Sequence, residues 1–305
     1  MRAAVIDCGT NTIRLLVAGL SDKGALDEVT RGQELVRLGQ GVDGSGVFHP
    51  DALARTFAAV DAFAAQIRSL DVDRVRFLAT SAARDVSNRD ELFDGVRERL
   101  GVEVDVISGD EEARLSFLGA LSGGPVSQGP ALVMDIGGGS TELILGDLDG
   151  TITSARSLDM GSVRIRERFL ASDPPTDDEI ARARAFVVDL IDSSGVDLAS
   201  TGTWIGVAGT ATSVSALTQG LTAYDRTKVH NSTVPLGSLF ALSEELLRTS
   251  VADTMRRYPM LQPLRAEVIC AGVMICAEVG RRTGVPMTVR ETDILDGATL
   301  ELLQR

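Results

Sequence analysis

The sequence predicts a mixed α/β protein made of two duplicated lobes. In each half, three hairpin-linked strands precede an alternation of helices and strands, which is typical of mixed α/β folds. Both halves also contain one loop signature: an apolar strand, an aspartate, a Gly/Ser/Thr/Asn turn and a second apolar strand. The two copies stand at a constant offset of 128 residues and pair Asp7 with Asp135, Gly9 with Gly137, Thr12 with Ser140, and Leu16 with Ile144.

Hydrophobic periodicity predicts the elements of the first half. Apolar runs predict strands at 3–6 and 13–19, on either side of the first loop, and a third strand at 26–37. Helices and strands then alternate as helix 51–69, strand 74–79, helix 89–100, strand 103–107 and helix 109–121.

The second half repeats this order after a linker. The low-complexity run 122–130, which is rich in glycine, serine and proline, predicts the linker. Strands are expected at 131–135, 141–147 and 151–158, followed by helices 161–170 and 177–192, strand 203–207, helix 210–219, helices near 236–249 and 263–282, strand 286–289 and helix 293–303.

Composition excludes several classes of protein. The length of 305 residues and 44% hydrophobic content suffice for two cores. No stretch approaches the roughly 18 apolar residues of a membrane helix, and no signal pattern opens the chain. Three cysteines lack metal-ligand spacing, which favours a reducing cytoplasm, and a net charge of −13 argues against nucleic-acid binding.

The duplicated loops are the candidate site for a cation and phosphate. A single aspartate after a strand is usually a turn former, but Asp7 and Asp135 occupy equivalent positions before glycine-rich turns. Facing aspartates can hold a divalent cation, and Mg²⁺ needs only one or two carboxylates. The second turn consists of Gly137, Gly138, Gly139 and Ser140. Its backbone amides are expected to bind phosphate together with Thr10 and Asn11 of the first turn. The alternative for this turn is a simple hairpin.

Two adjacent glutamates at the start of helix 109–121 differ in their expected roles. Ser108 and Glu111 fit a capping box, in which Glu111 reaches back to the amide of Ser108. Glu112 lies about 100° further round the helix and is left free. We therefore expect Glu112, rather than Glu111, to be available for chemistry.

An anionic substrate would be met by local cationic and amide groups. Arg84 follows Thr80-Ser81 at a strand-to-helix turn, where anions are favoured, although a surface pair with Asp85 is the alternative. Gly209 and Thr210 open a helix and add an amide and a hydroxyl donor. Further candidate contacts to a longer anion are Arg14 and Arg265.

Three other features are set aside. The run 39–44 fits Gly-x-Gly-x-x-Gly but does not open a helix at once, so a loop beside the substrate is the better interpretation. Cys8 has no predicted histidine partner and is not expected to be a nucleophile. Asp71-x-Asp73 lies between a helix and a strand and lacks the threonine of aspartyl-phosphate motifs.

Several blocks together resemble a known family. A duplicated ribonuclease H-like lobe with an aspartate loop in each half resembles the actin, sugar kinase and heat-shock chaperone ATPase superfamily. The ordered blocks resemble the exopolyphosphatase and guanosine pentaphosphate phosphohydrolase family over nearly the whole chain; they are 79–84, 107–113, 135–142, 157–164 and 206–210, together with the first loop.

The resemblance implies a fold and a division of roles. It implies two ribonuclease H-like domains with a cleft between them, with 1–124 plus 290–305 in one lobe and 125–289 in the other. It implies a metal site of Asp7, Asp135 and Glu142 for Mg²⁺, or Mn²⁺ as the alternative, and Glu112 as general base. It further implies a cytoplasmic homodimer, and no histidine-aspartate domain is expected after Arg305.

The leading functional hypothesis is magnesium-dependent hydrolysis of the terminal phosphoanhydride of inorganic polyphosphate. Water would attack in line, with Glu112 as base and with amides, Asn11 and Arg84 stabilising the transferring phosphoryl group. The close alternative is a guanosine pentaphosphate 5′-phosphohydrolase. From other classes, a kinase-like phosphotransferase and a non-catalytic nucleotide sensor remain open. No nucleic-acid or membrane partner is expected.

Overall fold

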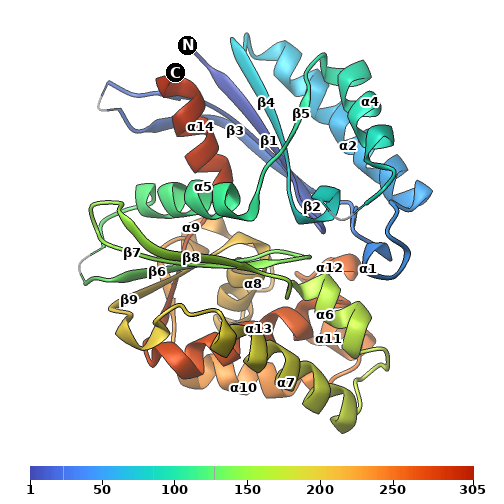
Figure 1. The fold of residues 1–305 in the computed structure, drawn as a ribbon, viewed down its shortest axis with the longest axis vertical. Coiled ribbons are helices and arrows are strands. Elements are labelled where there is room, and N and C mark those ends of the chain that lie inside the picture. Colours follow the sequence, from blue (N-terminus) through green and yellow to red (C-terminus); the bar gives the residue numbers. More distant parts are fainter. Residues whose placement is uncertain (23, 85, 127) are drawn as a thin grey trace.

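Two β-sheets lie one above the other with helix α5 (Gly109–Ser122) between them (Figure 1). This computed structural model describes residues 1–22, 24–84, 86–126 and 128–305. The five-stranded sheet has the order β3-β2-β1-β4-β5, and the six-stranded sheet has the order β10-β11-β9-β6-β7-β8. The predicted mixed α/β fold is confirmed.

The first lobe is built on the five-stranded sheet. Antiparallel hairpins join β1, β2 and β3, whereas β4 and β5 run parallel to β1. The strands are β1 (Ala3–Cys8), β2 (Thr12–Leu20), β3 (Leu26–Leu35), β4 (Arg74–Ala79) and β5 (Val104–Val106). The helices preceding α5 are α1 (Val42–Ser45), α2 (Pro50–Ser69), α3 (Ser81–Arg84) and α4 (Arg89–Leu100).

The second lobe repeats this strand arrangement. β6 pairs antiparallel with β7 and parallel with β9, as β1 does with β2 and β4. Its strands are β6 (Ala131–Ile136), β7 (Thr141–Gly146), β8 (Ile152–Leu158), β9 (Thr203–Val207), β10 (Ser232–Val234) and β11 (Met287–Val289). Its helices are α6 (Ser162–Phe169), α7 (Asp177–Ser193), a 3₁₀ turn (Leu198–Ser200), α8 (Ala208–Thr218), α9 (Arg226–Val229), α10 (Leu236–Leu247), α11 (Val251–Arg257), α12 (Pro263–Ala266) and α13 (Ile269–Thr283).

Helices α5 and α14 (Ile294–Gln304) fill the space between the sheets. On one side of α5, Leu115 packs with Val5, Leu16 and the first residues of α14. On the other side, Phe117 packs against β6, β7 and β9. The chain thus leaves the second lobe after β11 and places α14 against β1 and β2 of the first lobe (Figure 1).

The helix predicted at 263–282 is two helices. Its apolar periodicity continues without a break because α12 and α13 both bury an apolar face. A turn at Glu267 and Val268 nevertheless separates the two helices. Short elements were also missed, namely α1, α3, α9, β10 and the two-turn helix α11.

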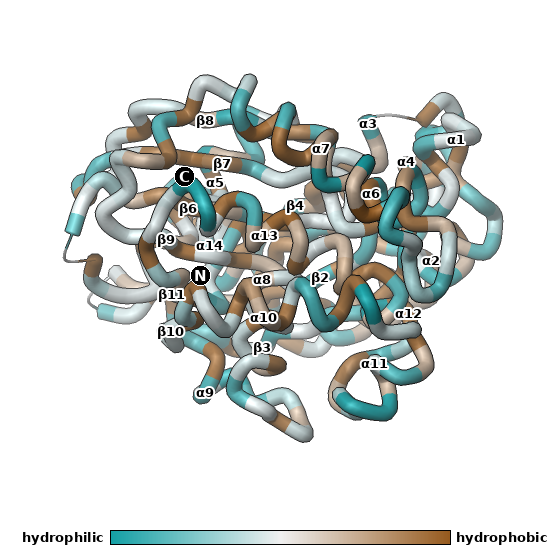
Figure 2. The backbone as a smooth tube through the Cα atoms, turned by 90° about the horizontal axis from the view of Figure 1, so that it is seen from below, coloured by the Kyte–Doolittle hydropathy of each residue, from teal (hydrophilic) through white to brown (hydrophobic). Residues whose placement is uncertain are grey.

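Hydrophobic residues concentrate in the centre of the molecule. In Figure 2 the hydrophobic tube segments lie along the inner strands and α13, and the hydrophilic ones mark peripheral turns. The larger core cluster belongs to the second lobe and includes the buried Trp204. Among the helices of the described residues, none combines the length and apolar character needed to cross a bilayer.

Candidate active site

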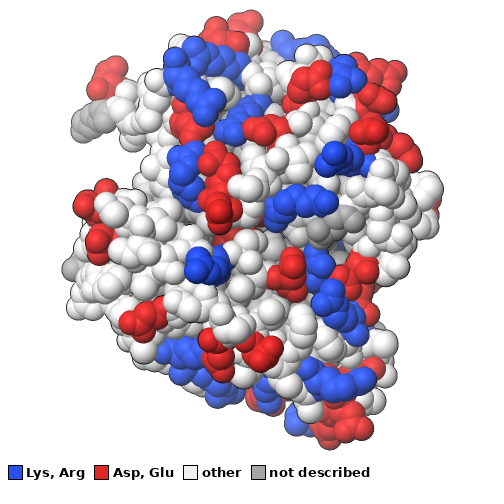
Figure 3. Space-filling view, in the orientation of Figure 1, with Lys and Arg blue, Asp and Glu red and all other residues white. Residues whose placement is uncertain are grey.

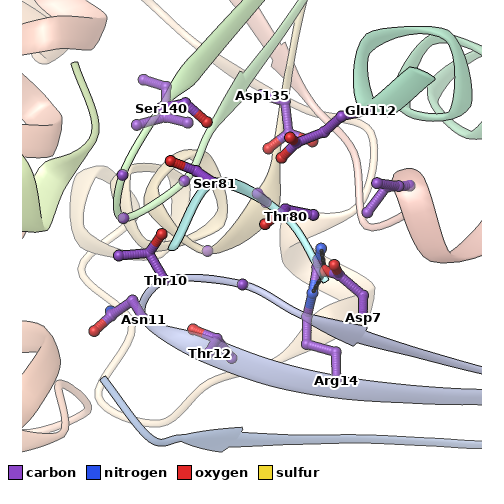
Figure 4. A pocket seen from close by; sticks show the side chains of 18 of the residues that line it. Asp7, Thr10, Asn11, Thr12, Arg14, Thr80, Ser81, Glu112, Asp135 and Ser140 are labelled. Carbon is purple, nitrogen blue, oxygen red and sulfur yellow. Dashed lines mark hydrogen bonds and ion pairs between the residues drawn. The ribbon is translucent and has the colours of Figure 1, made fainter. Parts of the chain in front are cut away.

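A narrow cleft of about 60 Å³ lies where the two duplicated loops face each other (Figure 4). Residues from both lobes line it, so the predicted loops do come together. The lining consists of Asp7, Gly9, Thr10, Asn11, Thr12, Arg14, Gln33, Thr80, Ser81, Glu112, Asp135, Ile136, Gly137, Gly138, Gly139, Ser140, Ala208, Gly209, Arg265 and Ile294.

The two loops have the same turn. The Gly9 N–H donates to the Thr12 carbonyl at 3.0 Å, and the Gly137 N–H donates to the Ser140 carbonyl, also at 3.0 Å. These bonds stand at equivalent positions of the repeat. The sequence repeat is therefore also a structural repeat, and it includes the hydrogen bond that closes the turn.

The carbonyls of the second loop are used by the start of α6. Backbone N–H groups of Gly161, Ser162 and Val163 donate to the carbonyls of the three loop glycines at 2.9–3.1 Å. Among the described residues, no acceptor pairs with the N–H groups of Gly138 or Gly139. The N–H groups of Gly138 and Gly139 are thus available to bind an anion, as in a phosphate-binding turn.

Two of these glycines are needed because the loops touch. A Cβ at Gly139 would lie 2.6 Å from Ser81 Oγ and from Thr10 Oγ1, and one at Gly138 would lie 3.0 Å from Thr10 Cβ. An added side chain at either position would therefore have to displace Thr10 or Ser81 of the facing lobe.

Hydroxyl and amide groups of the first lobe complete the anion-binding wall. Asn11 is 3% exposed, and neither its side-chain nitrogen nor its oxygen has a partner in the described structure. Thr80 and Ser81, which we did not assign to the site, follow β4 and enter the cleft beside Thr10 (Figure 4). The available signal was their position after a strand parallel to β1.

The repeat brings different partners to its two aspartates. Asp7 lies opposite Arg14 in the β1–β2 register, and Asp135 lies opposite Glu142 in the β6–β7 register. Arg14 Nε and Nη2 both donate to Asp7 Oδ2, at 3.1 and 2.6 Å. Asp135 Oδ2 instead accepts from Ser116 Oγ at 2.6 Å.

Glu142 is buried behind the cleft rather than in its wall. It is 1% exposed and accepts from Ser157 Oγ at 2.7 Å. Burial, with the nearby carboxylates of Glu112 and Asp135, raises its pKa well above 4.5.

Helix α5 presents Glu112 to the cleft. Ser108 is the N-cap and accepts from the Glu111 N–H at 3.2 Å, as predicted. The reciprocal half of the capping box is wrong, because the Glu111 carboxylate accepts two hydrogen bonds from Arg114, one turn further on. Glu111 is still occupied, and Glu112 lines the cleft beside Asp135 (Figure 4).

The environment of Glu112 suits a proton acceptor near neutral pH. Burial raises its pKa to about 7, against the opposing effect of Arg84. Arg84 Nη1 donates to Glu112 Oε2 and to the Ile107 carbonyl, each at 2.9 Å. Arg84 therefore contacts the candidate base and does not line the cleft; Asp85, its alternative partner, is outside the described residues.

Helix α12 adds a cationic side chain, Arg265, to the cleft beside the turn that follows β9. Arg265 is 8% exposed, and no carboxylate of the described residues lies within 4.0 Å of it. Burial and the neighbouring Arg14 lower its pKa to about 10. Gly209 gives it room, since a Cβ there would lie 2.4 Å from Arg265 Nη2. Thr210, by contrast, faces Gly272 of α13 and does not line the cleft.

Two of the three carboxylates predicted to hold a cation line the cleft, namely Asp7 and Asp135. The described residues contain no group of three or more His, Cys, Asp or Glu side chains placed to hold a metal together. In the described part of the chain, Asp7 Oδ1 is buried without a hydrogen-bond partner, and Asp135 lines the same cleft. Mg²⁺ can be held by one or two carboxylates with substrate oxygens. Glu142 does not line the cleft, and its predicted role at the metal stays a prediction.

The features set aside earlier have structural roles. Cys8 is buried, and burial raises its pKa far above its usual range. The 39–44 run forms a turn and the short helix α1, and the Gly39 N–H supports the loop from behind by donating to the Thr10 carbonyl at 2.8 Å. Asp43 in this run pairs with Arg164 and Arg168 of α6 in the other lobe.

The cleft and fold match known proteins along the whole chain. The model of the Ppx/GppA phosphatase family matches residues 17–282. Exopolyphosphatase 2 of Mycobacterium tuberculosis is 43% identical, and the alignment covers 99% of this chain and 98% of that protein. A bifunctional 3-dehydroquinate synthase/phosphatase of Fusobacterium nucleatum is 30% identical, covering 98% of this chain and 46% of that protein.

Solved structures agree with this assignment. The crystal structure of an exopolyphosphatase-like protein has a TM-score of 0.94 at 38% identity, covering 100% of this chain and 99% of that one. A Ppx/GppA family member of Aquifex aeolicus has a TM-score of 0.83 at 27% identity, covering 100% and 98%. The chain therefore belongs to the Ppx/GppA phosphatase family.

Proposed function

We propose that this protein is an exopolyphosphatase, which hydrolyses the terminal phosphoanhydride of inorganic polyphosphate and releases orthophosphate. The observation that carries the proposal is the buried Glu112 carboxylate, poised near neutral pKa in a cleft between two phosphate loops. The full-length similarity to exopolyphosphatase 2 supports the substrate class.

The terminal phosphoryl group is held between the loops. The unpaired amides of Gly138 and Gly139 and the unsatisfied side chain of Asn11 provide donors from opposite walls. Arg14 and Arg265 provide positive charge for the next phosphate. These donors are fixed before the reaction, so they stabilise the charge that develops in the transition state without reorganisation.

Glu112 orients and deprotonates the attacking water. A base with a pKa near the working pH combines a usable deprotonated fraction with a driving force for proton transfer. Arg84 holds one carboxylate oxygen, which fixes the direction of the other. This positioning role replaces the direct phosphate contact that we expected for Arg84.

Mg²⁺, or Mn²⁺ as the alternative, completes the proposed site, with Asp7 and Asp135 as the residues that would hold it. When bound, the cation would neutralise charge on the phosphate oxygens. Ser116 fixes the Asp135 carboxylate by donating to Oδ2. Asp7 is fixed by Arg14, which uses only one of its two oxygens.

The decisive experiment is phosphate release from polyphosphate by Glu112→Gln. We expect the rate to fall by about 10²–10⁴-fold, because the general base is removed while its shape and its contact with Arg84 are kept. Glu111→Gln on the same helix turn is the matched control and should retain activity. A Glu112→Gln protein that releases phosphate at the wild-type rate would refute the assignment of the base.

A second cavity supports guanosine pentaphosphate as the second candidate substrate. It measures about 340 Å³, adjoins the cleft and shares Arg14 and Gly209 with it. Tyr224 lines it at 47% exposure, available for stacking, and Glu291 can accept hydrogen bonds from a base. Parallel rates on short polyphosphate, long polyphosphate and guanosine pentaphosphate would separate these substrates.

The distribution of charged side chains on the surface favours a substrate that binds inside the cleft. On the face in Figure 3, acidic and basic side chains are interspersed without an extended basic area.

We propose a cytoplasmic location because the three cysteines are buried and form no disulfide. The expected homodimer stays a prediction, which light scattering of the purified protein would test.

A further inference from the structure

The last helix contributes an aspartate to the active site that the sequence did not single out. Asp293 is the N-cap of α14 and is 4% exposed. Its Oδ2 accepts from Arg14 Nη1, 279 residues away in sequence. Arg14 is thus held between two carboxylates, those of Asp7 and Asp293.

The contact of Arg14 with Asp7 is one-sided. An arginine and a carboxylate commonly pair through two parallel hydrogen bonds, one to each oxygen. Here Nε and Nη2 both reach Asp7 Oδ2, and Asp7 Oδ1 is buried without a partner in the described structure. The third nitrogen, Nη1, donates a hydrogen bond to Asp293 Oδ2.

We propose that Asp293 is a positioning residue for the cation site. By holding Nη1, it keeps the Arg14 guanidinium turned so that Asp7 presents a free Oδ1 for Mg²⁺. Without Asp293, Arg14 is free to rotate and to pair with both oxygens of Asp7. This inference rests on the proposed function only in so far as that function requires the cation.

Asp293 is itself rigidly held. Its Oδ1 accepts from the Leu295 N–H at 3.0 Å, and its own N–H donates to Asp296 Oδ2 at 2.9 Å. Asp296 in turn pairs with Arg31 of β3 at 2.6 Å. The carboxylate therefore cannot turn away from Arg14 without breaking the cap of α14.

The second lobe needs no such device. The residue equivalent to Arg14 in the repeat is Glu142, so no arginine faces Asp135 across the strand pair. Asp135 receives a neutral hydroxyl donor from Ser116 instead. Glu112 and Glu142 also lie near Asp135, but in the described structure neither holds an arginine that pairs with Asp135.

The test is Mg²⁺ binding by isothermal titration calorimetry in the absence of substrate, with Mn²⁺ binding by electron paramagnetic resonance as a second probe. Asp293→Asn keeps an oxygen for the Leu295 cap but turns an amide toward Arg14. We expect its dissociation constant for Mg²⁺ to rise about 10-fold or more, as for other residues that orient metal ligands. Asp293→Ser also keeps a cap and cannot reach Arg14, so it should behave alike.

Two comparisons separate positioning from general damage. Glu301→Gln removes a carboxylate from the same helix that pairs with Arg76 and Arg114, and it should change the dissociation constant less than about threefold. In an Arg14→Met background, Asp293→Asn should have no further effect, because its action passes through Arg14. Thermal denaturation of each variant confirms that it is folded.

Several results would overturn the inference. These are wild-type affinity in both Asp293 variants, an undiminished effect of Asp293→Asn in the Arg14→Met background, and a wild-type protein that takes up neither cation. A wild-type protein that binds Mg²⁺ as described but releases no phosphate from polyphosphate would instead refute the proposed function and leave the role of Asp293 standing.

Discussion

Glu112→Gln is predicted to stabilise the metal-free protein at neutral and alkaline pH. In the native state burial raises the pKa of Glu112 to about 7, whereas an unfolded chain would restore its usual value of 4.5. The native state therefore holds this proton more tightly than the unfolded state does. The contribution of Glu112 to the free energy of unfolding is fully present below pH 4.5 and is lost as pH rises to about 7.

The size of the effect follows from the difference between these pKa values. At about 1.4 kcal/mol per pH unit, it amounts to about 3 kcal/mol above pH 7. A glutamine does not titrate, so the variant escapes this loss. In a chain of this size, we expect a melting temperature about 6 °C above wild type at pH 8 and little difference at pH 4.5.

The assay is thermal denaturation in EDTA between pH 4.5 and 8.5. Glu111→Gln is a control of opposite sign, because Arg114 lowers the pKa of Glu111 and its charge stabilises the fold at neutral pH. That variant should lose stability at pH 8, where Glu112→Gln gains it. Parallel stability curves for wild type and Glu112→Gln over this range would refute the electrostatic reasoning.

Two further variants test the walls of the cleft. Gly139→Ala places a Cβ 2.6 Å from Ser81 Oγ and Thr10 Oγ1, so the rate of phosphate release should fall by about 10²-fold. The control is Gly237→Ala in α10, where the added Cβ meets no atom within 4 Å and the rate should be unchanged. Arg265→Met removes a buried cation that lacks a carboxylate partner, so KM for polyphosphate should rise about 10-fold or more in initial-rate measurements while the melting temperature does not fall.

The duplicated loops and the role of α5 were predictable because their signals are local. A strand, an aspartate and a glycine turn are contiguous in sequence, and the repeat itself implies that two such turns face each other. The N-cap at Ser108 likewise depends on residues within one helical turn. These signals sufficed for the fold class and for the place of Glu112 in the cleft.

The partners of the charged groups were not predictable, because they depend on contacts distant in sequence. In the sequence, Asp293 is indistinguishable from an ordinary helix N-cap, and its hydrogen bond with Arg14 depends on the packing of α14. Arg84 has several carboxylates within its reach along the chain, and only the packing of α3 against α5 selects Glu112. Thr210 follows Gly209 directly, yet helix geometry turns its side chain toward α13 rather than the cleft.

Charge has diverged between the two copies of the repeat, and this divergence gives the cleft a direction. Arg14 pairs with Asp7 and Asp293, and Arg265 reaches Thr12 of the same loop at 3.4 Å, so the two guanidinium groups that line the cleft both lie beside the first loop. Around the second loop, by contrast, the carboxyl groups of Glu142 and Glu112 lie near Asp135, and burial raises the pKa of both. An anionic chain is attracted to the first region and a water-activating base works in the second. In-line displacement needs the attacking and leaving oxygens on opposite sides of the phosphoryl group, and we infer that this asymmetry orients the substrate so that its end faces Glu112.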